Sequence, residues 1–158
     1  MIARSLWTVA VVLLIAGCTS GSSSTFSPNS ASVDSSYSCP VGASNVHYDL
    51  HGTIDVHNGT SKAVSISSVD ATLTLAAVKG AWLQKVGDRY DAGNITFTPA
   101  EVAAGANATL VVTIPTACTG RAATSPVASG DYVVGFTMIT SAGTFKLDSK
   151  DRHRISTG

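Results

Sequence analysis

The sequence has little charge and few aromatic residues. Charged side chains make up 13% of its 158 residues, ten Lys and Arg balance ten Asp and Glu, and only 6% of the residues are aromatic. A neutral chain offers no basic surface to nucleic acid, so we expect no nucleic-acid partner. The short basic run from Lys150 to Arg154 contains an aspartate, and it predicts only a solvated tail.

Sequence motifs of catalysis are also missing. The chain has no G-x-S-x-G nucleophile elbow and no Walker-type or dinucleotide-binding glycine motif, and Glu101 is its single glutamate. A hydrolase needs a nucleophile with a base, and a glycosidase needs paired carboxylates. Since neither arrangement stands out, we expect a protein that is not an enzyme and uses no cofactor.

The only long apolar run lies at the N-terminus. After Arg4 the segment LWTVAVVLLIAG is shorter than the roughly 20 residues of a membrane-spanning helix, and it predicts a signal peptide over residues 1–17. Its end, Ile15-Ala16-Gly17-Cys18, resembles the lipobox of bacterial lipoproteins. The resemblance implies that Cys18 is acylated and anchors the chain to the cell membrane or outer membrane, outside the cytoplasm. An ordinary secretory signal followed by a chance cysteine is the alternative.

Composition divides the remaining chain into three parts. Ten of the twenty residues from 19 to 38 are serine, a content too polar to bury a core. Residues 18–38 therefore predict the acylated cysteine and a flexible tether, 39–150 a folded domain, and 151–158 a polar C-terminal tail. No further apolar span follows, so the membrane is expected as a partner only through the lipid on Cys18.

Two cysteines remain after Cys18 is assigned to the anchor. Cys39 and Cys118 form an even pair in an oxidising compartment, which favours a disulfide that closes a loop of about 80 residues. The alternative is a pair of free thiols or metal ligands, although their separation matches no short metal-binding motif.

Alternation of apolar and polar residues dominates the predicted domain. In 45–57 the apolar residues recur at every second position, and Asn58-Gly59 then supplies a turn signal. The alternation changes phase around Ser67-Ser68, where a turn or bulge is expected. Further strands are predicted at 63–67, 69–78, 94–98 and 107–115, with a hairpin over 131–140 and 143–149. Together these patterns predict an all-β antiparallel sandwich of about six to eight strands.

Two stretches resemble secreted bacterial immunoglobulin-like domains. They are GTIDVHNGTSKAVSISSVDATLTL (52–75) and SGDYVVGFTMITSAGTFKL (129–147), which look like a strand pair and a closing hairpin. The resemblance covers most of 45–149 and implies an immunoglobulin-like β-sandwich, but no reaction. The chain departs from antibody domains because no tryptophan lies on a clear core strand between the cysteines.

The predicted strand at 45–57 carries the candidate metal ligands. Its alternate polar residues are His47, Asp49, His51, Asp55 and His57. Residues two apart on one strand lie about 6.5–7 Å apart, so neighbouring pairs could contact one zinc or copper ion. A tight site needs further ligands from another strand, and none can be identified. The simpler interpretation is the solvated face of an ordinary strand.

The predicted connection at 79–93 holds Trp82, Leu83 and Tyr90. These residues suggest either a plug over the core or a loop that binds a partner. We therefore expect a binding, adhesion or cell-envelope scaffold module with an unknown protein partner. A metal-binding lipoprotein and an accessory subunit of an envelope transport or sensing complex are the alternatives.

Overall fold

The computed structural model describes residues 25–43, 45–118 and 127–157. Within these ranges the chain forms eleven β-strands and no helix, and hence no helix that could cross a membrane. The predicted signal peptide of residues 1–17 and the predicted lipidation site Cys18 lie outside the described residues.

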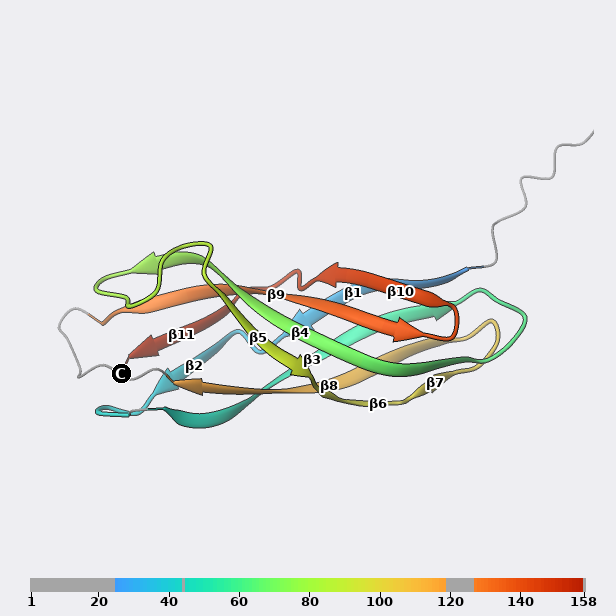
Figure 1. The fold of residues 1–158 in the computed structure, drawn as a ribbon, viewed down its shortest axis with the longest axis horizontal. Helices are drawn as coiled ribbons and strands as arrows, with labels where there is room; N and C mark the ends of the chain where they lie inside the picture. The colour runs from blue at the N-terminus through green and yellow to red at the C-terminus, as the bar shows by residue number, and fades with distance from the viewer. Residues whose placement is uncertain (1–24, 44, 119–126, 158) are drawn as a thin grey trace, which may run out of the picture.

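The strands form two sheets that pack face to face (Figure 1). The smaller sheet has the order β1-β3-β8-β6 and consists of β1 (Phe26–Val33), β3 (Val46–Asn58), β8 (Asn107–Cys118) and β6 (Thr96–Thr98). The larger sheet has the order β2-β11-β9-β4-β5 and consists of β2 (Ser36–Cys39), β11 (His153–Thr157), β9 (Ser129–Thr140), β4 (Val64–Lys79) and β5 (Arg89–Asn94). Two short strands complete it, since β10 (Gly143–Asp148) pairs with β9 and β7 (Glu101–Val102) pairs with β4.

The strand order is that of an immunoglobulin-like sandwich. Such domains place strands A, B, E and D in one sheet and C, F and G in the other. Here β1, β3, β8 and β6 occupy the first four places, and β4, β9 and β10 occupy the other three, with β5 extending the second sheet beyond β4. The predicted fold class is confirmed, while the described residues form more strands than the six to eight expected.

Alternation along the central strands builds the core between the sheets. The inward residues of β3 and β8, such as Leu50 and Ile114, face those of β4 and β9, such as Leu73 and Phe136, and all four are buried. The pairing of β4 with β9 shifts register between Ile66 and Ser68. This bulge explains the predicted change of phase and keeps both halves of β4 facing the core.

The flexible tether predicted for residues 18–38 is wrong from Phe26 onward. Strand β1 pairs with β3 and buries Phe26, Ala31 and Val33, while β2 pairs with β11. Serine content misled the prediction because an edge strand needs few apolar residues. Its backbone bonds to a neighbouring strand, and its serines face solvent.

The polar tail predicted for residues 151–158 is likewise wrong for 153–157. Strand β11 lies between β9 and β2, antiparallel to the first and parallel to the second. Its alternate residues His153, Ile155 and Thr157 point inward and are buried. The folded domain therefore extends beyond the predicted limits of 39 and 150 in both directions.

The sandwich has two distinct ends. At one end β1 begins, beside Asn58 at the close of β3. At the other end Cys118 lies opposite Val46, and the β4–β5 connection over residues 80–88 closes the sheets. We call this the disulfide end; in Figure 1 it is on the left, and β1 begins on the right.

Candidate functional site

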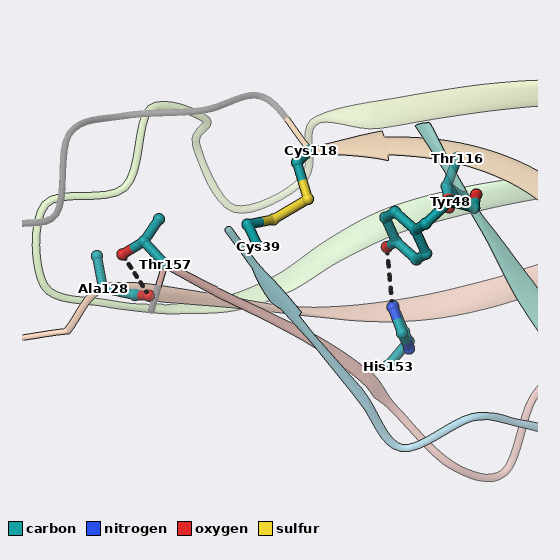
Figure 2. Close-up of a disulfide and its surroundings, with 7 residues drawn as sticks. All are labelled: Cys39, Tyr48, Thr116, Cys118, Ala128, His153 and Thr157. Atoms are coloured by element: carbon teal, nitrogen blue, oxygen red, sulfur yellow. Dashed lines mark hydrogen bonds between the residues drawn. A yellow bond between two sulfur atoms is a disulfide. The ribbon is translucent and has the colours of Figure 1, made fainter. Parts of the chain in front are cut away.

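A disulfide joins the two sheets at the disulfide end. Cys39 closes β2 in the larger sheet and Cys118 closes β8 in the smaller one, with their Cα atoms 5.9 Å apart (Figure 2). Both side chains are buried. The predicted pairing is confirmed, and the bond links the last residues of two strands that belong to facing sheets.

A pocket of about 180 Å³ opens beside this disulfide. Strands β2, β3, β4, β5, β8, β9 and β11 and the β4–β5 connection all contribute to its walls. The residues that line it are Cys39, Asn45, His47, Leu73, Trp82, Gln84, Tyr90, Thr116, Ala117, Tyr132, Ile155 and Thr157. Among these described residues there is no Asp, Glu, Lys or Arg, so the pocket suits an uncharged group.

An aromatic side chain of the β4–β5 connection hydrogen-bonds to one of β9 in the pocket wall. The Trp82 indole Nε1–H donates to the Tyr132 hydroxyl at 3.2 Å, and that hydroxyl donates to Gln84 Oε1. Burial raises the pKa of Tyr132, so its hydroxyl keeps the proton it donates. Gly130 lies under the indole, because a Cβ there would meet Trp82 Nε1 at 2.7 Å.

A half-buried chain of hydrogen bonds through Tyr48 and His153 lies near the disulfide (Figure 2). His153 Nδ1 lies 2.7 Å from the backbone carbonyl oxygen of Asp34, which can only accept, so Nδ1 carries the proton. The neutral ring therefore accepts the Tyr48 hydroxyl at Nε2, at 3.0 Å. Burial is the main cause that lowers the pKa of His153 and raises that of Tyr48 to about 12. Tyr48 also stacks on Tyr37, with ring centroids 3.8 Å apart.

Exposed apolar side chains lie on the connections at the disulfide end. They belong to three connections and to the strand residues that flank them, and we call them the apolar rim: Val41, Val46, Val78, Leu83, Val86 and Val127. Leu83 is 50% exposed and Val86 60% exposed. The pocket and the apolar rim thus lie at the same end of the sandwich, and exposed apolar groups of this kind are found at interaction sites.

The three residues singled out in the predicted 79–93 connection have different surroundings in the structure. Trp82 packs against the core as a wall of the pocket, as the plug interpretation expects. Leu83 points to solvent in the apolar rim. Tyr90 already belongs to β5, lines the pocket and donates its hydroxyl to the carbonyl of Pro115 at 3.4 Å.

The predicted metal ligands lie on the outer face of β3, where each has other surroundings. His51 Nδ1 is 3.3 Å from Asp34 Oδ2, His57 Nδ1 is 2.9 Å from Asn107 Oδ1, and Asp49 is exposed. His47 lines the pocket. In the part of the chain that the structure describes, no three His, Cys, Asp or Glu side chains come together as a metal site requires.

Asp55, the fifth predicted ligand, binds hydroxyl groups of the two neighbouring strands. Its oxygens accept from Thr109 at 2.7 Å and from Ser30 at 2.9 Å. These bonds lower the pKa of the Asp55 carboxyl, the bond from Thr109 most. The residue thus ties β1, β3 and β8 together across the outer face of the smaller sheet.

Sequence reasoning missed the partners that turn Trp82 into a pocket wall. Tyr132 and Gln84 complete the aromatic wall, and Thr116 and Ala117 form the opposite side. Alternation in DYVV does place Tyr132 inward on its strand. Its contact with Trp82, fifty residues away, depends on the pairing of β4 with β9.

Comparisons with known proteins assign no family to the chain. No protein-family model and no curated protein matches it. The chain is similar to the ASH/PapD-like domain of human CEP192, with 16% identity, 95% of both chains covered and a TM-score of 0.38. It is also similar to AggA, the major subunit of Escherichia coli aggregative adherence fimbriae, at 8% identity, with 84% of this chain and 95% of that one covered and a TM-score of 0.37. A third similar structure is the CooA pilin subunit of enterotoxigenic Escherichia coli. Its identity is 12%, the match covers 82% of this chain and 99% of that one, and the TM-score is 0.30. These likenesses carry no argument about function, and the fold assignment rests on the strand order.

Proposed function

We propose that the protein is a non-enzymatic binding module of the cell envelope, with the disulfide end as its binding surface. The observation that carries the proposal is the aromatic-walled pocket without acidic, lysine or arginine side chains, at the same end of the sandwich as the apolar rim. A concave apolar site with a few polar groups is the usual form of a ligand site. Lipid on Cys18 anchors the module outside the cytoplasm.

The position of the pocket suits a module displayed from a membrane. Strand β1 begins at the end of the sandwich that lies opposite the disulfide end (Figure 1). The pocket lies at the disulfide end. Strand β3 runs from one end to the other, which separates them by about 40 Å at 3.3 Å per residue. The eight steps from Cys18 to Phe26 reach at most about 29 Å. An anchor at Cys18 therefore keeps the start of β1 within that distance of the lipid, while the pocket lies at the opposite end of the sandwich.

The polar groups of the pocket support binding rather than catalysis. The Thr116 hydroxyl donates to the Tyr48 carbonyl at 2.9 Å, and the Thr157 hydroxyl donates to the Ala128 carbonyl at 3.3 Å. Neither is held by a base, as an activated nucleophile must be. The Trp82 indole donates to Tyr132, the Tyr132 hydroxyl donates to Gln84, and the Tyr90 hydroxyl donates to the Pro115 carbonyl.

Site-specific crosslinking in living cells tests the binding surface. A photoreactive amino acid replaces Leu83 in the rim or Val111 on the outer face of β8, both of which are 50% exposed. We expect a defined crosslinked product from position 83 that disappears with Trp82→Ala, and none from position 111. Equal products from both positions, or from neither, would reject the disulfide end as the binding surface.

Mass spectrometry of membrane fractions tests the anchor separately. We expect an N-terminal, acylated Cys18 in the membrane fraction and a Cys18→Ser chain that is no longer processed in this way. Recovery of the wild-type chain without lipid would overturn the anchor, and it would leave the binding surface to its own test.

A further inference from the structure

The pocket adjoins a stretch of β8 that has a free edge. Strand β3 pairs with β8 along one side as far as Cys118. On the other side β6 pairs only with the residues from Val111 to Thr113. Among the residues described by the structure, no strand pairs with 114–118 on this second side.

The backbone groups that face the free edge can be assigned from three residues. The carbonyl of Thr113 faces this side, since it lies 3.5 Å from the Thr96 hydroxyl of β6. Pro115, two residues on, has no N–H, and its carbonyl accepts the Tyr90 hydroxyl on the same side. Because backbone groups alternate along a strand, the N–H and C=O of Ala117 also face the free edge.

Ala117 therefore presents one donor and one acceptor at the mouth of the pocket that it lines. This is the pattern that one residue of an added strand satisfies, by exchanging two hydrogen bonds. A compact ligand without a backbone amide would leave one or both groups unmatched.

The pocket beside this edge fits an apolar side chain. Its aromatic polar atoms are already bonded through Trp82, Tyr132 and Gln84, so the walls offer mainly apolar surface. Its volume of about 180 Å³ exceeds the roughly 150 Å³ cavity that admits benzene. An added strand that fills it with one side chain would lay its other residues on the apolar rim.

We propose that the partner is an extended peptide segment that adds to β8 at Ala117 and inserts one uncharged apolar side chain between Trp82, Tyr90 and Tyr132. The proposal rests on the proposed function and names the partner of that same site. Strand addition takes affinity from main-chain hydrogen bonds and specificity from side-chain pockets, and both are present here. The Tyr90 hydroxyl, which now covers the Pro115 carbonyl, is displaced or rotated by the added strand.

The test uses the full-length chain in detergent micelles and the capped peptide acetyl-Thr-Val-Leu-Val-Thr-amide, followed by NMR. Two N-methylated forms serve as probes: one carries the methyl on Leu, and the other carries methyls on both Val. Since alternate N–H groups of a strand point to opposite edges, each form blocks one edge and leaves the side chains unchanged. Free indole, which has no backbone, reports on the pocket alone.

We expect the parent peptide to shift the signals of Ala117 and the Trp82 indole. One N-methylated form should bind at least tenfold more weakly, while the other stays within about threefold of the parent. In the Ala117→Pro variant, which removes the N–H at the free edge, the peptide should bind at least tenfold more weakly than to the wild type, while free indole reports on the pocket of the wild-type chain.

Other outcomes separate the two proposals. Equal binding of both N-methylated forms, or unchanged peptide binding by Ala117→Pro, would overturn strand addition. Indole that binds while the peptide does not would also overturn strand addition, and the pocket would remain a binding site. Failure of both indole and the peptide to shift the Trp82 signal would count against the proposed function itself.

Discussion

His153 is a titratable residue enclosed by the core. It is 1% exposed, donates to the Asp34 carbonyl and accepts from Tyr48, so its neutral form is fully hydrogen-bonded. A second proton on the ring would place a charge in a buried environment, a cost that the nearby Asp34 offsets only in part. The pKa of His153 is therefore lowered, with burial as the main cause.

Stability should consequently fall as the pH drops below about 6.5, the ordinary histidine pKa. In that range His153 is protonated in the unfolded chain but stays neutral in the folded chain. The free energy of unfolding therefore decreases with decreasing pH. We expect the wild type to lose more stability between about pH 7.5 and pH 5 than the His153→Asn variant, measured by urea unfolding.

The variant is chosen because an asparagine amide can still donate to the Asp34 carbonyl but does not titrate. Asp55 and Asp131 both have a lowered pKa, so their contributions are lost only at lower pH and are common to both chains. Parallel pH profiles for the two proteins would show that His153 is not the group responsible.

Gly130 is the residue that leaves room for the pocket's indole. A methyl group at this position would overlap the Trp82 ring and crowd Leu75. We predict that Gly130→Ala displaces Trp82, weakens indole binding at least tenfold and costs about 1–3 kcal/mol of stability. NMR of the indole N–H together with urea unfolding measures both effects.

Gly135→Ala on the same strand is the matched control. A Cβ there would meet Asp148 Oδ1 at 3.0 Å, and that side chain is the movable end of an exposed residue. It should keep indole binding. If Gly130→Ala also keeps it, the indole is not the wall of the binding site.

At the scale of the strands, the sequence predicted what depends on local pattern. The alternation in β3, the bulge in β4 and the β9–β10 hairpin follow from residues that are neighbours in the chain. The sequence did not predict strands β1, β2 and β11. Their few apolar residues form no clear alternation, and these strands are held in place by pairing with strands distant in sequence, such as β3 and β9. An edge strand is defined by its partner as much as by its own composition.

The candidate site divides in the same way. The sequence already singled out Cys39, Cys118, Trp82 and Tyr90, since a cysteine pair and the aromatic residues of a predicted connection are visible in it. The pocket could not be foreseen, because it requires the pairing of β4 with β9, which brings Tyr132 under Trp82. The five polar residues of β3 were predicted to share a face, and they do, but sharing a face does not make them converge.

Asn58 closes β3 and organises the crossing to β4. It is fully buried, its amide nitrogen donates to the carbonyls of Lys62, Val102 and Ala103, and its oxygen accepts from Thr60. We predict that Asn58→Ala lowers the free energy of unfolding by about 2–3 kcal/mol, because several carbonyl groups inside the protein lose their hydrogen-bond donor. Urea unfolding measures the change.

Asn94→Ala provides the comparison. Asn94, like Asn58, is followed two residues later by a threonine, but its side chain is exposed. Its substitution should stay within about 0.5 kcal/mol of the wild type. Similar losses for the two variants would mean that the bonds of Asn58 do not hold the crossing.

For the whole molecule, the disulfide is the one cross-link between side chains of the two sheets among the described residues. We predict that the double variant Cys39→Ala and Cys118→Ala loses about 2–4.5 kcal/mol, mainly because its unfolded chain is less constrained. The free energy of unfolding, from urea titration of both chains under oxidising conditions, measures this. Dithiothreitol should lower the wild type to the same level. An unchanged unfolding midpoint in the variant would show that the link adds no stability.

The parallel pairing of β2 with β11 has a consequence for the order in which the domain assembles. Ser36 to Cys39 must wait for Arg154 to Thr157, more than a hundred residues later in the chain. Contacts so distant in sequence make folding slow. A chain that emerges with its N-terminus first therefore has an incomplete sheet until residues as late as Thr157 have emerged. The edge of β9 that pairs with β11 stays uncovered until this last strand is in place.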